Sequence, residues 1–474
     1  MTADLSLPPS LKHYLLLFLA AAAFHFTGTW TLPLIDRDEP RFSEASREML
    51  ERQDFVVPYL NNKYRFDKPP LTYWLQTSAF RFFGQNEAAA RLPSVLSAAG
   101  VAVLVLAWGT RMKNAALAWR AAIIFTLCLQ VALHAKAAVA DMLLVFFVTL
   151  AAWAGWEMSR DQANHRRWWA VFFGALALGF LAKGPIAWLP LIPVAIRIRC
   201  WKMGAGFIGG IIVMIGLVAL WGIPALERTN GEFFKIGIGK HVVSRSVATM
   251  EGHGAKSALG YIGTLPFYFL TVFASFAPWS WFLPRLVKQR KTLWQESDNR
   301  YLIWLVLLYF GVFTLVKTKL PHYTLPAFPM LAMLLAGLLT GAQVRKFGIA
   351  TAVFLIALSL IAFPLAAPLF PAPSLATQSA SVLKPEMEFA SIEFVEPSLY
   401  WSFRKYVRGF HKVIDTRKAP KWMAQSGPRF YILPTEQVAA TFPELDPTWK
   451  TFRHRGLNFA KGNRTDLTML VKTE

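Results

Sequence analysis

The sequence has few charged residues and little cysteine. Only 16% of its 474 residues are Asp, Glu, Lys or Arg, whereas an average soluble protein carries about 25%. Its two cysteines, Cys128 and Cys200, lie in or beside apolar segments, so no disulfide framework is indicated. Polar linkers are missing from the first three quarters of the chain, although a soluble chain of this length would divide into several domains. These absences exclude disulfide-rich, disordered and ordinary soluble proteins.

Apolar residues, by contrast, are abundant: 55% of the chain is hydrophobic and 14% is aromatic. A helix needs about 20 consecutive apolar residues to cross a bilayer. Candidate segments lie near 14–34, 92–110, 117–135, 142–158, 169–184, 186–197, 204–222, 259–284, 301–316, 324–341 and 347–369. Several are short or contain proline, so we expect a polytopic α-helical membrane protein with about 11–13 transmembrane helices. The first segment also resembles a secretory signal, but we expect it to be retained.

The charge of the chain is strongly positive, with 50 Lys and Arg against 28 Asp and Glu, a formal net charge of +22. Part of this excess lies in short connectors at 111–113, 165–167, 197–202, 285–300 and 345–346. Short basic connectors face the cytoplasm. This rule predicts a cytoplasmic N-terminus and places the longer segments 35–90, 223–257 and 317–323 on the outer face. The excess of cations therefore does not indicate a nucleic-acid partner.

The hydropathy falls after Pro371, and the pattern changes. Segments 429–433 and 467–471 are typical of short buried strands, and 398–409 has the pattern of an amphipathic helix. We therefore expect a transmembrane domain over 1–370, followed by a small α/β domain over 371–474 on the outer, periplasmic side.

The strongly polar clusters all fall on the predicted outer face. Asp38, Glu39, Arg41 and Glu44 follow the first span. Carboxylates at such a boundary can act as a general base or bind a cation, although a helix cap explains them equally well. Asp141 and Lys183, each at the end of a span, can likewise be either functional residues or residues that cap a helix.

Cations suited to phosphate recur on this face. Lys68 follows Asp67 and precedes two prolines, and Lys317, Lys319 and Tyr323 lie at the end of a span. A guanidinium matches phosphate oxygens, so Arg245 in the loop of His241 and His253 is a further candidate. Interfacial snorkelling is the alternative for the lysines, and the two histidines are weak as a zinc pattern. Together the clusters favour an active site for a lipid-linked phosphate over a transporter, which would carry polar groups in mid-span.

Three sequence runs resemble one known family. Residues 38–50, 66–70 and 317–329 (DEPRFSEASREML, FDKPP and KTKLPHYTLPAFP) are similar to the bacterial aminoarabinose transferases. These enzymes are relatives of the protein O-mannosyltransferases within the GT-C glycosyltransferases, which use lipid-phosphate sugars. The resemblance covers most of residues 15–410, and it implies a GT-C membrane fold with a periplasmic α/β domain.

The resemblance also implies roles for individual residues. Asp38 matches the catalytic acid of the family, and Asp141 matches its second outer-face acid. Lys68, Arg245 and Tyr323 match positions that bind the polyprenyl phosphate of the donor. Asp67 and His241 match a pair that holds a divalent metal, zinc by resemblance, although the family usually has Glu at the position of Asp67. No nucleotide cofactor is expected.

The sequence therefore predicts an enzyme of the bacterial inner membrane. It would transfer a sugar from an undecaprenyl-phosphate donor to an acceptor at the periplasmic face, with lipid A or lipopolysaccharide as the favoured acceptor and membrane lipids as its surroundings. A protein O-glycosyltransferase and a lipid or solute transporter are the alternatives.

Overall fold

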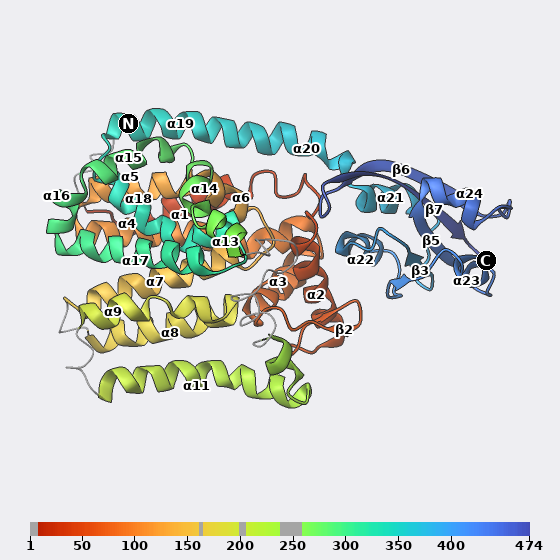
Figure 1. The fold of residues 1–474 in the computed structure, drawn as a ribbon, viewed down its shortest axis with the longest axis horizontal. Coiled ribbons are helices and arrows are strands. Elements are labelled where there is room, and N and C mark those ends of the chain that lie inside the picture. The colour runs from red at the N-terminus through yellow and green to blue at the C-terminus, as the bar shows by residue number, and fades with distance from the viewer. Residues whose placement is uncertain (1–7, 161–164, 199–204, 238–257) are drawn as a thin grey trace. The chain divides into compact units, whose positions relative to one another are not determined.

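The computed structural model describes residues 8–160, 165–198, 205–237 and 258–474, and the chain divides into two compact units (Figure 1). Unit 1 comprises Met1–Thr27, Phe66–Leu75 and Arg91–Ile356. Unit 2 comprises Gly28–Arg65, Gln76–Ala90 and Ala357–Glu474. Unit 2 thus contains the whole predicted tail domain together with most of the long loop after the first helix. Whether 371–474 is a domain by itself remains a proposal.

Unit 1 is built from helices. In chain order these are α1 (Leu11–Phe26), α4 (Glu87–Met112, which begins in unit 2), α5 (Ala115–Thr126), α6 (Leu129–Ala135), α7 (Asp141–Met158), α8 (His165–Lys183), η1 (Pro185–Trp188), α9 (Leu191–Arg197), α11 (Ala205–Arg228), α13 (Ala258–Thr264), α14 (Phe267–Ser275), η3 (Trp279–Phe282), α15 (Leu283–Lys288), α16 (Arg290–Gln295), α17 (Ser297–Leu315), η4 (Pro321–Ala327), α18 (Phe328–Ala336) and α19 (Gly341–Ala357). Each of the eleven predicted spans contains helix.

Fewer of these helices than expected are long enough to cross a membrane unbroken. Among the described residues, four helices qualify, or up to six if two bent pairs each count as one span. The pair α5 and α6 bends by 64°, and the segments Gly260–Ser275 and Trp279–Lys288 bend by 114°. At the first bend the Leu129 N–H donates to the Ala277 carbonyl at 2.9 Å. A backbone group released by the break thus finds a partner inside the bundle, as an apolar environment requires.

Glycines allow close helix packing in unit 1, where α7, α8 and α11 run side by side (Figure 1). A Cβ atom on Gly155 would lie 2.2 Å from the Val194 side chain, and one on Gly210 would lie 2.0 Å from Phe173. Only glycine therefore fits these two positions, between α7 and α9 and between α8 and α11. Small residues at helix contacts are the usual means of association in a bilayer.

The end of α1 is held by a buried lysine. Lys136 Nζ donates to the carbonyl oxygens of Phe24, His25 and Thr27 at 3.1, 2.9 and 2.5 Å. The last carbonyls of a helix have no partner within the helix and carry partial negative charge. One ammonium group satisfies three of them, so Lys136 ties α1 to the segment between α6 and α7.

Unit 2 contains a five-stranded sheet in the order β4-β3-β5-β7-β6. Its strands are β3 (Glu388–Ser391), β4 (Lys412–Val413), β5 (Arg429–Pro434), β6 (Lys450–Asn458) and β7 (Asn463–Lys472). β3 is parallel to β4 and β5, and β7 is antiparallel to β5 and β6. The two predicted strands are confirmed within β5 and β7. The helix predicted over 398–409 is shorter in the structure. It is α22 (Pro397–Phe403), which ends at Arg404, and the side chain of Arg404 joins an ion-pair network.

The remaining elements of unit 2 belong to the first loop, to the end of the apolar segment Gly341–Leu369 or to the tail. They are α2 (Asp38–Arg52), the ribbon of β1 (Tyr59–Leu60) and β2 (Lys63–Tyr64), α3 (Leu71–Phe83, which begins in unit 1), η5 (Leu358–Ala362), α20 (Phe363–Ala366), η6 (Ala367–Leu369), α21 (Pro371–Ser379), α23 (Ala419–Met423), η7 (Thr435–Gln437) and α24 (Val438–Thr441).

A buried ion-pair network joins the first loop to the tail. Arg404, directly after α22, pairs with Glu44 of α2 and with Glu51 at 2.6 Å, and its side chain is 4% exposed. Arg47 of α2 pairs with Glu44 at 2.9 Å, donates to the Trp401 carbonyl at 3.0 Å and lies over the Trp401 ring. The Trp401 indole donates to Glu87 at 2.9 Å. Segments more than 300 residues apart are thereby held in one body.

Replacing Arg404 with Met should destabilise the protein. The change leaves the buried Glu44 carboxylate with one cation fewer, and breaking a buried pair from one side costs about 3–5 kcal/mol. We expect a lower melting temperature for the purified protein and faster tryptic cleavage within 28–65. Arg408→Met, at an exposed position of the same segment, is the matched control. Equal melting temperatures for Arg404→Met and Arg408→Met would contradict the importance of the network.

Candidate active site

A carboxylate and an ammonium meet at one end of the adjacent helices α7 and α8. Asp141 is the first residue of α7, and Lys183 is the last residue of α8. An acid at a helix N-terminus and a base at a C-terminus are both stabilised by the helix dipole. Lys183 Nζ lies 2.5 Å from Asp141 Oδ1. The structure therefore brings together two residues that sequence analysis treated separately.

Two histidines complete this cluster. His134 lies in the last turn of α6, and His322 lies in η4; their ring centroids are 4.9 Å apart. His322 Nε2 is 3.8 Å from Asp141 Oδ1, and Tyr323 lies 5.8 Å from Lys183 Nζ, measured to its ring centroid. Unit 1 thus gathers one carboxylate, one ammonium, two imidazoles and one phenol from α6, α7, α8 and η4.

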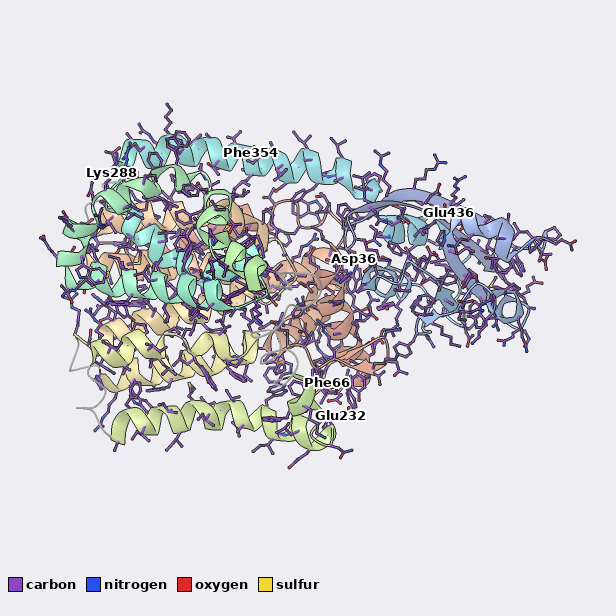
Figure 2. The ribbon with its side chains drawn as sticks, viewed as in Figure 1. Asp36, Phe66, Glu232, Lys288, Phe354 and Glu436 are labelled. Carbon is purple, nitrogen blue, oxygen red and sulfur yellow. The ribbon has the colours of Figure 1, made fainter. Side chains whose placement is uncertain are left out.

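The segment of Asp67 and Lys68 also belongs to unit 1. Lys68 Nζ is 3.0 Å from the Asp67 carboxylate. The preceding Phe66 stacks edge-on against Phe233 at 5.6 Å, close to Glu232 (Figure 2). A Cβ atom on Gly237 would lie 3.0 Å from the Phe66 carbonyl oxygen. Residues 238–257, and with them the predicted site residues His241, Arg245 and His253, lie outside the described part of the chain.

The two lysines after α17 have different surroundings. Lys319 Nζ donates to the carbonyls of Phe313 and Thr314 at 3.0 and 2.5 Å, in the last turn of α17. Its ammonium faces the ring of Tyr268. Lys317 is exposed. In this structure Lys319 caps a helix, and its role toward a donor phosphate stays a prediction.

Asp38 is an accessible carboxylate on unit 2. It begins α2, its side chain is 64% exposed, and Arg41 lies 3.8 Å away. Its neighbours have internal partners: Glu39 accepts the Ile35 N–H at 2.8 Å, and Glu44 lies in the ion-pair network. Of these three acids, Asp38 is the one free to meet a substrate, as a general base must.

Asp36, two residues earlier, was not predicted as a site residue. Its Oδ1 accepts the Ser398 N–H at 2.9 Å, and the adjacent Arg37 pairs with Glu396 at 3.6 Å. Burial, aided by the nearby Glu396 carboxylate, raises the pKa of Asp36 to about 7. No signal in the sequence separates this half-buried acid from its neighbours, because the groups that cover it come from the tail.

Comparison with known proteins places the chain in a family. Residues 13–239 match the family model of dolichyl-phosphate-mannose-protein mannosyltransferase. An uncharacterized protein of Aquifex aeolicus is 31% identical over 70% of this chain and 75% of its own length. The undecaprenyl phosphate-alpha-4-amino-4-deoxy-L-arabinose arabinosyl transferase of Pectobacterium atrosepticum is 31% identical over 67% of this chain. ArnT from Cupriavidus metallidurans, crystallised with undecaprenyl phosphate, superposes with a TM-score of 0.77 over 98% of both chains, at 17% identity.

The chain belongs to the ArnT-like family of GT-C glycosyltransferases. It is therefore an enzyme, and the transporter alternative is dropped. The ArnT-like fold, a bundle of apolar helices with a small C-terminal sheet domain, agrees with the predicted fold class. The chain spans 58% of the length of the Pectobacterium transferase. The donor and the acceptor of this ArnT-like protein are therefore proposed below.

The histidine cluster was missed as a metal-capable group. His134, Asp141 and His322 each offer one ligand atom, and these atoms all lie within 4.8 Å of one another. Two imidazoles and one carboxylate are a ligand set of catalytic zinc sites, so the residue types fit a divalent metal. The spacing of these residues along the chain gives no zinc pattern, because the three come from different helices.

The raised pKa of the half-buried Asp36 predicts a pH dependence of stability that Asp36→Asn should remove. The folded state holds a proton on Asp36 up to about pH 7, whereas the unfolded chain releases it near its usual pKa of 3.8. The contribution of protonated Asp36 to the stability of the folded state is complete below pH 3.8 and is lost as the pH rises through 7. We expect Asp36→Asn, which keeps an oxygen for the Ser398 N–H, to melt at a higher temperature than the parent, by a margin that grows from pH 5 to pH 8. Exposed Glu444→Gln is the control, and a constant margin would contradict the assignment.

Proposed function

We propose that this protein transfers one sugar from an undecaprenyl-phosphate-linked donor to an acceptor at the periplasmic face of the inner membrane, with lipid A as the favoured acceptor. The relative from Pectobacterium is named as an undecaprenyl phosphate aminoarabinose transferase, and the structural neighbour from Cupriavidus was crystallised with undecaprenyl phosphate. Both names support a polyprenyl-phosphate donor.

The cluster around Asp141 and Lys183 carries this proposal. A polyprenyl phosphate keeps its tail in the bilayer and its phosphate at the surface. The protein therefore needs cations at the ends of apolar helices, and Lys183 occupies such an end, half-buried beside Tyr323. Lys68, directly before α3, is half-buried as well and is the second candidate for the phosphate.

The reaction breaks the bond between the anomeric carbon and the donor phosphate oxygen. An acceptor oxygen attacks the anomeric carbon from the opposite face, and the configuration inverts. Negative charge grows on the leaving phosphate, and positioned cations such as Lys183 stabilise it. Asp38 takes the proton from an acceptor hydroxyl, a task that contributes about 10²–10⁴-fold in rate. Where the acceptor is an ionised phosphate, Asp38 only orients it.

A protein acceptor is the second candidate, because the match to the protein mannosyltransferase model covers residues 13–239. The two acceptors are separated by mass spectra of lipid A and of periplasmic proteins from a deletion strain. Loss of a sugar from lipid A alone would support the first proposal, and loss from proteins alone would overturn it.

The donor is tested with purified protein, lipid A and a panel of undecaprenyl-phosphate sugars, with release of undecaprenyl phosphate as the readout. We expect sugar-dependent release that falls about 10²–10³-fold in Lys183→Met, the loss typical for removing one charge-stabilising group. Asp38→Asn should also reduce transfer to a hydroxyl acceptor. Lys346→Met, an exposed cation of a basic connector, is the control. No release with any donor, or full activity of Lys183→Met, would refute the proposal.

For a divalent metal we propose the ligand set His134, Asp141 and His322. Catalytic zinc sites have three protein ligands, and the described residues complete only this set. Bound zinc would supply positive charge for the leaving phosphate. Lys183 already pairs with Asp141, so metal and ammonium would share one carboxylate.

Metal content separates this set from the pair implied by resemblance. We expect zinc, measured by mass spectrometry on purified protein, to fall below one tenth of the parent value in His134→Gln/His322→Gln and to persist in Asp67→Asn/His241→Gln. The reverse result would assign the metal to Asp67 and His241. Absence of zinc from the parent protein, even after dialysis against the metal, would reject both sets.

A further inference from the structure

The positive charge of the tail is concentrated in one hairpin. Residues 450–472, which form β6, β7 and their turn, contain six Lys or Arg and one acid, Asp466. The rest of 371–474 contains nine basic and nine acidic residues. The whole net charge of the tail, +5, therefore lies on 23 residues. Five of these cations are exposed: Lys450, Arg453, Arg455, Lys461 and Arg464.

Within unit 2 the hairpin is fixed against the end of an apolar helix. The segment Gly341–Leu369 is long and apolar enough to cross a membrane. His454 of β6 lies 2.7 Å from the Pro368 carbonyl oxygen, measured from Nε2, and the Phe459 ring stacks on Phe370 at 4.2 Å. A Cβ atom on Gly456 would lie 2.5 Å from the Leu369 carbonyl oxygen, so only glycine permits this approach.

The two faces of the hairpin therefore differ. Side chains alternate along a strand, so His454 and Gly456 face the helix end while Arg453 and Arg455 point to the other side. Arg464 pairs across the ladder with Leu457, which puts it on the arginine face. Arg453 and Arg455 share Asp466 at 2.6 and 2.8 Å. This carboxylate cannot balance both, and the Arg455 side chain remains 76% exposed.

We propose that the β6–β7 hairpin docks onto the phosphates of anionic phospholipid headgroups in the surrounding bilayer. The headgroup layer on each side of a membrane is roughly 5–8 Å thick, and the hairpin contacts the residues at which the apolar helix ends. Exposed apolar side chains continue below it on the same helix, at Ile361 and Leu365. Cationic side chains on a hairpin that contacts the end of a lipid-facing helix are close enough to the headgroup layer to bind anionic lipid. The positive-inside rule does not account for it, because the tail lies on the outer side in the proposed orientation.

Hydrogen exchange of the full-length protein in nanodiscs tests this proposal. β6 is an edge strand, so its outward amides report directly on what covers it. With 30% phosphatidylglycerol in phosphatidylcholine, we expect exchange over 450–464 to slow at least about fivefold relative to phosphatidylcholine alone, the factor that one surface cation contributes. High salt should remove the difference.

Charge-neutralising variants decide which cations act. Lys450→Gln/Arg455→Gln/Lys461→Gln/Arg464→Gln should lose the protection, while Arg453 stays to pair with Asp466. Arg408→Gln/Arg417→Gln/Lys418→Gln/Lys421→Gln removes as many exposed cations elsewhere in the tail and should keep it. Unchanged exchange of β5 in both variants confirms folding. Equal exchange in the two lipid mixtures would overturn the proposal. Protection by lipid A but not by phosphatidylglycerol would also overturn it, because the hairpin would then bind the acceptor.

Discussion

The cost of placing charge among apolar helices determines where this protein can carry chemistry. A charge at the centre of a span is expensive and needs a partner, whereas a helix end offers both a dipole and water. Asp141 and Lys183 occupy opposite termini of α7 and α8 at the same end of the helix pair. The same constraint explains Lys136 and Lys319, whose ammonium groups satisfy the last carbonyls of α1 and α17. Lysine thus caps helices in unit 1, and in the proposed function Lys183 also offers positive charge to the donor phosphate.

The same distinction applies to the acids of unit 2. Glu44 has two arginine partners and is buried, Glu39 holds a backbone N–H, and Asp36 is enclosed by residues of the tail. Each of these groups is committed to the fold. Asp38 lies among them on the exposed first turn of α2, with Arg41 as its ion-pair partner. In the proposed mechanism, Asp38 is therefore the accessible carboxylate of this group, and its partnered neighbours hold the first turn of α2 in place.

Sequence patterns predict what depends on local order and composition. The apolar segments, the strands at 429–433 and 467–471, and the polar clusters at the span ends are all visible in the sequence. The bends between helices are not visible in the sequence. A break such as the one at Cys128 depends on whether another segment offers a partner to the released backbone group, and here the Ala277 carbonyl accepts the Leu129 N–H. The pairing of Asp141 with Lys183 and His322 is likewise not visible, since three helices must pack before these side chains meet.

The contacts between the first loop and the tail show most clearly what the local sequence does not predict. Nothing in the local sequence of α2 indicates that Arg47 will lie over Trp401 or that Glu44 will pair with Arg404.

An excess of like charge in one segment nevertheless signals a missing partner. Glu44, Glu48 and Glu51 of α2 pair with arginines from α2 itself and from the tail. The β6–β7 hairpin carries six cations and one acid, and that acid is shared by two arginines. We propose that this excess charge meets the phosphates of lipid headgroups, a partner that is not part of the chain.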